Sequence, residues 1–250
     1  MRFNLHTTHG LVIFYAGLFV SGHEDYLLRK KENRGVKSVI TAGDLLCSNF
    51  FKLKVDIDYD LIGLIDKSEF GEANPSYKQA TKELKELLDS SSVDGICQIA
   101  NDNVEGQIVI SGHDENINYM VSVLKDLGYK AIKLKVSAPF HSALMKPAEA
   151  PMSSALIQTN IKIPSVPLIA NVTAKQTVSP DEIRSNLVSQ ICGTVRWRET
   201  MDELHRLGVN ELVEIGSGKV LTGLAKKTPH NFKVTNISTV AEMEQFVSDI

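Results

Sequence analysis

The alternation of apolar and polar residues is irregular in the first third of the chain and becomes regular after residue 75. Apolar side chains then recur either at the helical period or in short strand-like runs, separated by turn residues. The pattern predicts strands at 61–65, 95–100, 107–111 and 131–136 and helices at 77–88 and 114–127, with a turn at 101–103 and Gly106. This β-α-β-β-α-β order is typical of a ferredoxin-like unit, with edges near residues 60 and 136.

The second half of the chain alternates helical and strand-like segments. The pattern predicts helices at 142–161, 179–192, 198–207, 219–227 and 240–250, and strands at 166–172, 211–215 and 233–238. Alternation of this kind is typical of an α/β fold with a mostly parallel sheet. We therefore divide the chain into residues 1–59, 60–136 and 137–250.

Composition narrows the class of protein. Hydrophobic residues make up 43% of the 250 residues and charged residues 23%, which is ordinary for a globular protein with a sizeable core. The 27 basic and 30 acidic residues nearly cancel to a net charge of −3, so nothing favours nucleic acid as a partner. Cys47, Cys97 and Cys192 form no CxxC pair, and we expect reduced, buried thiols and neither disulfides nor a zinc site.

The apolar run at residues 11–20 has three interpretations. It is too short to span a membrane as a helix, which needs about 20 apolar residues. A signal peptide is the second, because Arg2 precedes the run and Ala16 and Gly17 are small, but no A-x-A cleavage site follows. We favour the third interpretation, a buried strand or helix.

Several residues that could carry chemistry have simpler explanations. The GSGK sequence at 216–219 lacks the earlier glycine and the following Ser or Thr of a phosphate-binding loop, so we expect a tight turn that opens a helix. His113 has no second ligand at metal-binding spacing. His205 lies on a charged helix, where we expect it in solvent, and Trp197 between two arginines is expected to be a packed anchor.

His141 is the strongest candidate for catalysis, because it follows a strand and precedes a helix within residues 136–147 (VSAPFHSALMKP). A neutral imidazole there can take a proton from a hydroxyl nucleophile when a third group fixes its tautomer. Such a nucleophile usually lies in a G-x-S-x-G elbow. No such sequence occurs in these 250 residues.

The residues that surround His141 belong to a longer pattern. Residues 82–250 resemble bacterial malonyl-CoA:acyl-carrier-protein transacylases, and the matching segments lie in the same order at 99–112, 136–147, 166–172, 195–197 and 214–221. The resemblance implies an α/β-hydrolase-like large subdomain, incomplete at its N-terminus here, with an inserted ferredoxin-like small subdomain.

The resemblance also implies roles for two residues. His141 stands at the position of the general base, which activates a serine in a ping-pong reaction. Gln190 matches the glutamine whose main-chain carbonyl orients the histidine. Malonyl-CoA and the phosphopantetheinyl acyl carrier protein are the implied substrates, with no cofactor or metal, for a monomeric cytoplasmic enzyme of fatty acid biosynthesis that contacts neither membrane nor nucleic acid.

The chain also departs from the family. The family opens with a strand and a G-Q-G-S-Q loop, carries a G-H-S-x-G elbow, and binds the malonyl carboxylate with an arginine in an R-G-x-x-M context; we find none of these here. The nucleophile and this arginine are therefore unknown. Ser48 is the candidate nucleophile that the divergent segment offers, although it lacks flanking glycines. Arg34 and Gly35 match part of the arginine context, but they lie too far from His141 along the chain for us to assign that role.

Three hypotheses follow from these departures. The chain is an active transferase with a divergent nucleophile, an inactive truncated or rearranged remnant, or an acyltransferase domain of a polyketide synthase. The end of the chain near Ile250, with no linker beyond it, favours a stand-alone enzyme over the synthase domain.

Overall fold

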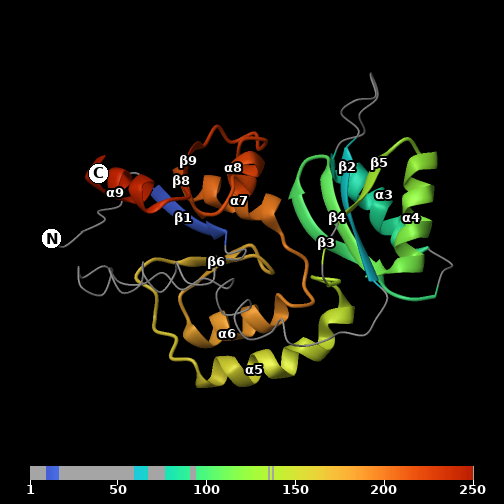
Figure 1. The fold of residues 1–250 in the computed structure, drawn as a ribbon, viewed down its shortest axis with the longest axis horizontal. Helices are drawn as coiled ribbons and strands as arrows, with labels where there is room; N and C mark the ends of the chain where they lie inside the picture. Colours follow the sequence, from blue (N-terminus) through green and yellow to red (C-terminus); the bar gives the residue numbers. More distant parts are fainter. Residues whose placement is uncertain are drawn as a thin grey trace. The chain divides into compact units, whose positions relative to one another are not determined.

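Figure 1 shows a computed structural model of the chain, which describes residues 10–16, 59–66, 77–90, 94–134, 136 and 138–249. The chain separates into two compact units, one formed by Lys54–Glu203 and the other by Met1–Leu53 with Leu204–Ile250. Both units contain helices and strands, which confirms the α/β class that the sequence pattern predicts. The finer subdomain assignment and its edges near residues 60 and 136 stay predictions.

The unit Lys54–Glu203 contains a four-stranded sheet with the order β3-β4-β2-β5. Neighbouring strands are antiparallel throughout this sheet. Its elements, in chain order, are β2 (Tyr59–Asp66), α3 (Tyr77–Asp89), β3 (Cys97–Val104), β4 (Gln107–His113), α4 (Asp114–Asp126) and β5 (Lys130–Leu134). All six were predicted from the sequence, within a few residues of these bounds.

A hydrophobic core joins the helices to this sheet. Ile117, Met120 and Leu124 recur at helical spacing on α4, and each is at most 1% exposed. They pack with Ile108 and Ile110 of β4, because alternate residues of a strand point to the same face. Leu127, expected on the same helical face, is instead exposed, since α4 ends at Asp126 and Gly128 turns the chain with a φ of 81°.

The turn predicted at residues 101–103 is wrong. β3 continues through these polar residues to Val104, and the hairpin turns at Glu105 and Gly106. Asn101 forms a parallel bridge with Val195, so the edge of β3 has a second backbone partner. That partner comes from a distant part of the sequence, and local turn propensity could not reveal it.

The rest of this unit is more broken than the pattern predicts. The single helix expected at 142–161 is a 3-10 helix, η1 (Ala143–Ala148), followed by α5 (Glu149–Gln158), because Pro147 cannot continue a regular helix. The buried strand expected at 166–172 is only β6 (Leu168–Ala170), and Leu168 is exposed. It pairs with an unexpected short strand, β7 (Lys175–Thr177), before α6 (Pro180–Ser189).

The second unit contains a parallel sheet of three strands. Its order is β1-β8-β9, formed by β1 (Gly10–Ala16), β8 (Val209–Gly216) and β9 (Lys233–Ile237). β1 covers the first part of the apolar run at 11–20, where a strand or helix was expected. Two further helices are α8 (Val220–Ala225) and α9 (Val240–Asp249).

The helix α7 (Trp197–Arg206) spans the boundary between the two units. Trp197 is buried at its start, as expected for a packed anchor. Across the part of the chain that the structure describes, no helix has the length and apolar character needed to cross a membrane.

Candidate active site

His141 lies in the turn between β5 and η1, and its backbone is left-handed, with a φ of 59°. This conformation costs a residue other than glycine about 1–2 kcal/mol, so the surroundings must hold it. Part of the support is local. The buried hydroxyl of Ser142 donates a hydrogen bond to the Pro139 carbonyl at 2.7 Å, and the Met145 amide donates to the Ser142 carbonyl at 3.0 Å.

The structure brings His141 and Gln190 together. The Nδ1 atom of His141 lies 2.9 Å from the main-chain carbonyl oxygen of Gln190. Gln190 is the C-cap of α6, where the last carbonyls have no partner within the helix. A helix end therefore supplies the acceptor, and Ser179 fixes the opposite end, since its side chain accepts a hydrogen bond from the Glu182 amide.

Two contacts at Nδ1 demand opposite tautomers of the imidazole. The Gln190 carbonyl can only accept, which requires a proton on Nδ1, whereas the Gln190 side-chain Nε2, 3.2 Å away, can only donate. We give precedence to the carbonyl, because its contact is shorter and a side-chain amide can exchange its nitrogen and oxygen by rotation. The resulting Nδ1–H tautomer leaves Nε2 with a lone pair.

The surroundings also set the charge of the imidazole. Burial lowers the pKa of His141 from its usual value of 6.5, because the charged form loses hydration. Backbone hydrogen bonds with Gln190 and Gly193 oppose this shift, but burial is the larger effect. His141 is therefore neutral at pH 7, which is the form that accepts a proton.

The segment after α6 is attached to the edge of β3 by successive hydrogen bonds. The Thr194 hydroxyl donates to the Ile99 carbonyl at 2.7 Å. The Val195 amide donates to the Ala100 carbonyl, and the Asp102 amide donates back to the Val195 carbonyl, both at 2.8 Å. These bonds anchor the chain that carries the Gln190 carbonyl to a strand of the sheet.

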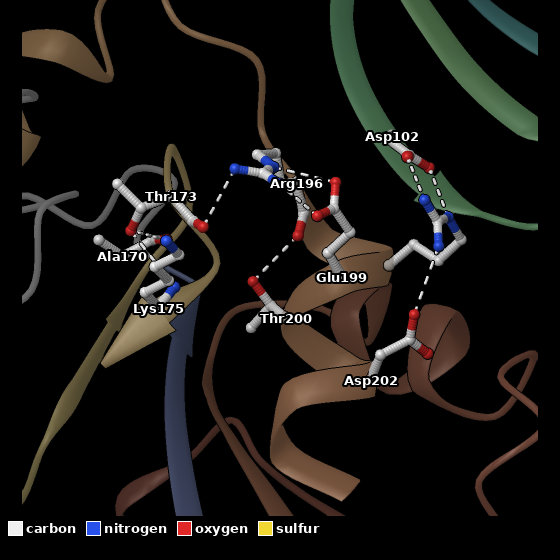
Figure 2. A network of polar contacts seen from close by, with 9 residues as sticks. Asp102, Ala170, Thr173, Lys175, Arg196, Glu199, Thr200 and Asp202 are labelled. Carbon is white, nitrogen blue, oxygen red and sulfur yellow. Dashed lines mark hydrogen bonds and ion pairs between the residues drawn. The ribbon is translucent and has the colours of Figure 1, made fainter. Parts of the chain in front are cut away.

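Two arginines extend this anchor (Figure 2). The Arg196 guanidinium donates to the Thr173 carbonyl at 3.1 Å and also binds the Glu199 carboxylate. The Arg198 guanidinium donates to both carboxylate oxygens of Asp102, at 3.2 and 3.0 Å. A bidentate pair of this kind fixes the relative orientation of the two side chains and also pairs their charges. The segment is thus held to the turn after β6 on one side and to β3 on the other.

Gly193 belongs to the same segment, and the sequence analysis did not single it out. A Cβ atom on Gly193 would lie 2.6 Å from Val172 and 2.7 Å from the Ser189 carbonyl oxygen, so no other residue fits without movement. A glycine shortly after a helix end was the signal available in the sequence.

The surroundings of the two described cysteines disfavour both as nucleophiles. Cys97 and Cys192 are half-buried, which corrects the expectation of buried thiols. Burial raises the pKa of Cys97 to about 12. Burial, and then a hydrogen bond with Glu149, raise the pKa of Cys192 to about 11. Both thiols are protonated at pH 7, whereas a nucleophilic cysteine must be a thiolate.

The other histidines within the described residues have structural surroundings. His113 Nδ1 accepts a hydrogen bond from the Ile96 amide at 2.8 Å. His205 is exposed, as expected, but it also stacks on His230 with ring centroids 4.3 Å apart and lies edge-on to Phe232. Neither surrounding resembles the turn that holds His141.

The GSGK turn opens α8, as predicted. Gly216 and Gly218 have φ values of 143° and 88°, which favour glycine. The buried Glu214 carboxylate accepts hydrogen bonds from the Leu221 and Thr222 amides, at 3.1 and 2.8 Å. Because the protein's own carboxylate occupies these amides, they are not available to a phosphate.

The candidate nucleophile Ser48 and the partial arginine match at Arg34 cannot be placed. Ser48 and Arg34 lie outside the residues that the structure describes, as does Cys47. The geometry described above therefore concerns the histidine and its orienting carbonyl.

Comparison with known proteins identifies relatives of this chain. No family model matches it. The malonyl CoA-acyl carrier protein transacylase of Bacillus subtilis (strain 168) is 39% identical over 163 residues, which cover 64% of this chain and 51% of the relative. The chain thus spans about half the length of the curated relatives it matches.

Solved structures give the same result. The acyl-carrier-protein S-malonyltransferase of Bartonella henselae is 39% identical and superposes with a TM-score of 0.68, covering 83% of this chain and 62% of that one. A malonyl-transacylase solved in complex with a type II PKS acyl-carrier protein is 30% identical, with a TM-score of 0.65 and coverage of 84% and 63%.

Proposed function

We propose that this chain, which is related over 64% of its length to the malonyl CoA-acyl carrier protein transacylases, transfers malonyl groups with His141 as its general base. The observation that carries the proposal is the 2.9 Å contact between His141 Nδ1 and the Gln190 carbonyl. It orients a neutral imidazole whose Nε2 carries the lone pair that accepts a proton, as general-base chemistry requires.

The proposed reaction has two half-reactions. In the first, His141 Nε2 takes the proton of a hydroxyl nucleophile as its oxygen attacks the thioester carbonyl of malonyl-CoA. The carbon–sulfur bond breaks, CoA leaves with the proton from the imidazolium, and malonyl remains as an oxygen ester. The Gln190 carbonyl stabilises the transient imidazolium, since it accepts from Nδ1–H in both charge states.

The second half-reaction reverses the first with a different thiol. His141 removes the proton of the carrier protein's pantetheine thiol, whose sulfur attacks the ester carbonyl. The ester bond to the hydroxyl oxygen breaks, and the imidazolium returns its proton to that oxygen. The cycle consumes no cofactor, and none of its steps uses a metal ion.

The proposal includes the wider features that the family resemblance implies. The sheet β3-β4-β2-β5 with α3 and α4 corresponds to the inserted ferredoxin-like subdomain, and residues 137–250 correspond to part of an α/β-hydrolase-like subdomain. The partner is an acyl carrier protein, since one structural relative was solved in complex with a type II PKS acyl-carrier protein. The protein acts as a monomer in the cytoplasm.

An intact-mass measurement tests the proposal. The protein is incubated with malonyl-CoA, and we expect a covalent malonyl adduct that maps to one hydroxyl residue and disappears when holo carrier protein is added. Loss of the adduct in Ser48→Ala would identify Ser48 as the nucleophile, and an unchanged adduct would exclude it. His141→Ala should slow adduct formation by about 10²-fold or more. An unchanged mass in a protein that remains folded would contradict malonyl transfer.

A second function is favoured by the absence of a G-x-S-x-G sequence from all 250 residues. Without such an elbow, the chain would be an inactive relative that binds carrier protein but transfers nothing. Calorimetric titration with holo carrier protein separates the two: binding without an adduct supports the inactive relative. A polyketide-synthase acyltransferase would instead prefer the carrier protein of such a synthase in the same titration.

A further inference from the structure

Gln98 in β3 contacts both segments that form the candidate site. Its side-chain Nε2 donates to the carbonyl of His141 at 3.4 Å and to the carbonyl of Cys192 at 3.3 Å. Its Oε1 accepts from the Ala143 amide at 3.0 Å. One side-chain amide therefore bonds three main-chain groups from two loops that are far apart in the sequence.

The orientation of this amide is determined by its partners. The two carbonyls can only accept and the Ala143 amide can only donate. Rotation of the Gln98 amide by about 180° would therefore place its oxygen against the two carbonyl oxygens and its NH₂ group against the Ala143 N–H. The two donated bonds are long and individually weak, but together with the shorter accepted bond they use both amide hydrogens and the oxygen.

The partners of Gln98 are the groups that determine where the imidazole points. His141 has a left-handed backbone, and Gln98 bonds its carbonyl together with the amide two residues later, so it bridges the turn. Cys192 lies two residues after Gln190, whose carbonyl contacts His141 Nδ1. Gln98 thus joins the backbone of the base to the segment that carries its orienting acceptor.

We propose that Gln98 is a positioning residue for the transfer reaction: its side-chain amide fixes the His141 turn against the Gln190 segment. The inference rests on the proposed function, because it assigns Gln98 to the base of that reaction. The hydrogen bonds of the Ser142 hydroxyl and the Met145 amide join the turn to itself within residues 139–145. The bonds of Gln98 join the backbone of this turn to the segment that carries the Gln190 carbonyl.

The test compares Gln98→Met with the wild-type protein. Methionine has a similar volume but can neither donate to the two carbonyls nor accept from the amide. We expect the ¹⁵N NMR spectrum of His141 to lose the dominant Nδ1–H tautomer. We also expect kcat for malonyl transfer to fall by about tenfold or more, with KM for malonyl-CoA changed less than about twofold.

A matched control is Gln176→Met, since Gln176 is also in a strand but is exposed. It should leave the tautomer and kcat unchanged. If Gln98→Met does not fold by circular dichroism, Gln98→Glu decides, because it keeps the acceptor and loses both donors. A wild-type tautomer in these variants would overturn the role of Gln98. A wild-type protein that takes no malonyl overturns the proposed function instead, and the tautomer measurement still decides the role of Gln98.

Discussion

The surroundings of the His141 imidazole lead to a prediction about its titration. Burial outweighs the hydrogen bonds with Gln190 and Gly193, so its pKa in the folded protein lies below 6.5. We expect its ¹³Cε1 resonance to titrate with a midpoint below that value. The rate of malonyl transfer should fall as the pH decreases through the same range, because the protonated imidazole cannot accept a proton. The same resonance in urea, which reports the unfolded chain, should titrate near 6.5.

The sign of the effect on stability follows from this difference. The unfolded chain binds a proton at a higher pH than the folded chain, so the contribution of His141 to folding falls as the pH decreases through 6.5. Below the pKa of His141 in the folded protein, this contribution no longer changes with pH. His141→Gln should therefore flatten the pH dependence of the free energy of unfolding in this range. A folded midpoint at or above 6.5 contradicts the prediction.

Gly193 gives a second prediction for a single residue. Alanine there would place its Cβ within 2.7 Å of the Ser189 carbonyl, a backbone atom that cannot rotate away. We expect Gly193→Ala to lower the free energy of unfolding by about 1–3 kcal/mol, measured by urea denaturation. Gly223→Ala is the control. It lies in α8 with open space around it, and should raise stability by about 0.5–1 kcal/mol.

The residues of the site differ in how visible they are in the sequence. His141 stands out because it follows an X-Pro dipeptide between a strand and a helix, in a segment that matches a known family. Gln98 does not stand out, because a polar residue in an apolar run usually marks the exposed face of a strand. Its three partners come from positions 43, 45 and 94 residues away, a relation that no local pattern contains.

At the scale of elements, the Arg198–Asp102 pair connects the start of α7 to the C-terminal half of β3. Arg198→Met should leave the largely buried Asp102 carboxylate without a bidentate donor. Hydrogen bonds to charged groups contribute about 1.5–3 kcal/mol, and we expect the free energy of unfolding to fall by about that amount. Because this pair helps to hold the Gln190 segment, the Nδ1–H tautomer of His141 should also become less populated.

The control for this prediction is an exposed pair in the same unit. The Nζ atom of Lys133 lies 3.0 Å from Oδ1 of Asp114, and both side chains are 41% exposed. Lys133→Met should change stability by less than about 1 kcal/mol, because solvent screens exposed ion pairs. Equal losses in the two variants would show that the connection between α7 and β3 has no special role.

The elements that could be predicted are long ones whose apolar residues recur on one face. α4 was found from its apolar positions, whose side chains form the core. β7 was not found, because it has three residues, two of them exposed, and its sequence KQT carries no alternation that a strand search detects. The strand character of residues 101–103 was missed for another reason, since Val195 stabilises it from a distant part of the chain.

At the scale of the molecule, the described site lies within one compact unit. His141, Gln190 and Gln98 all belong to Lys54–Glu203, together with the hydrogen bonds that join them. The division into two units was not predictable from the sequence, because one unit combines the two ends of the chain. Such a pairing, here of β1 with β8, depends on contacts of long sequence separation.

This organisation predicts that the second unit can be weakened without disturbing His141. In Glu214→Gln, a side-chain NH₂ replaces one of the two oxygens that accept from the Leu221 and Thr222 amides, so a buried donor loses its partner. We expect the free energy of unfolding to fall by about 1–3 kcal/mol in urea. Glu211→Gln on the same strand removes only an exposed pair with Lys233, and should cost less than about 1 kcal/mol.

In both variants the His141 resonances should keep the wild-type tautomer and titration midpoint under native conditions, because every bond described around the imidazole lies outside the altered unit. A shifted midpoint in Glu214→Gln alone would show that the parallel sheet contributes to the geometry of the base. The two units would then form a single functional structure, and the positioning of His141 would depend on residues beyond the contacts of Gln98 and Gln190.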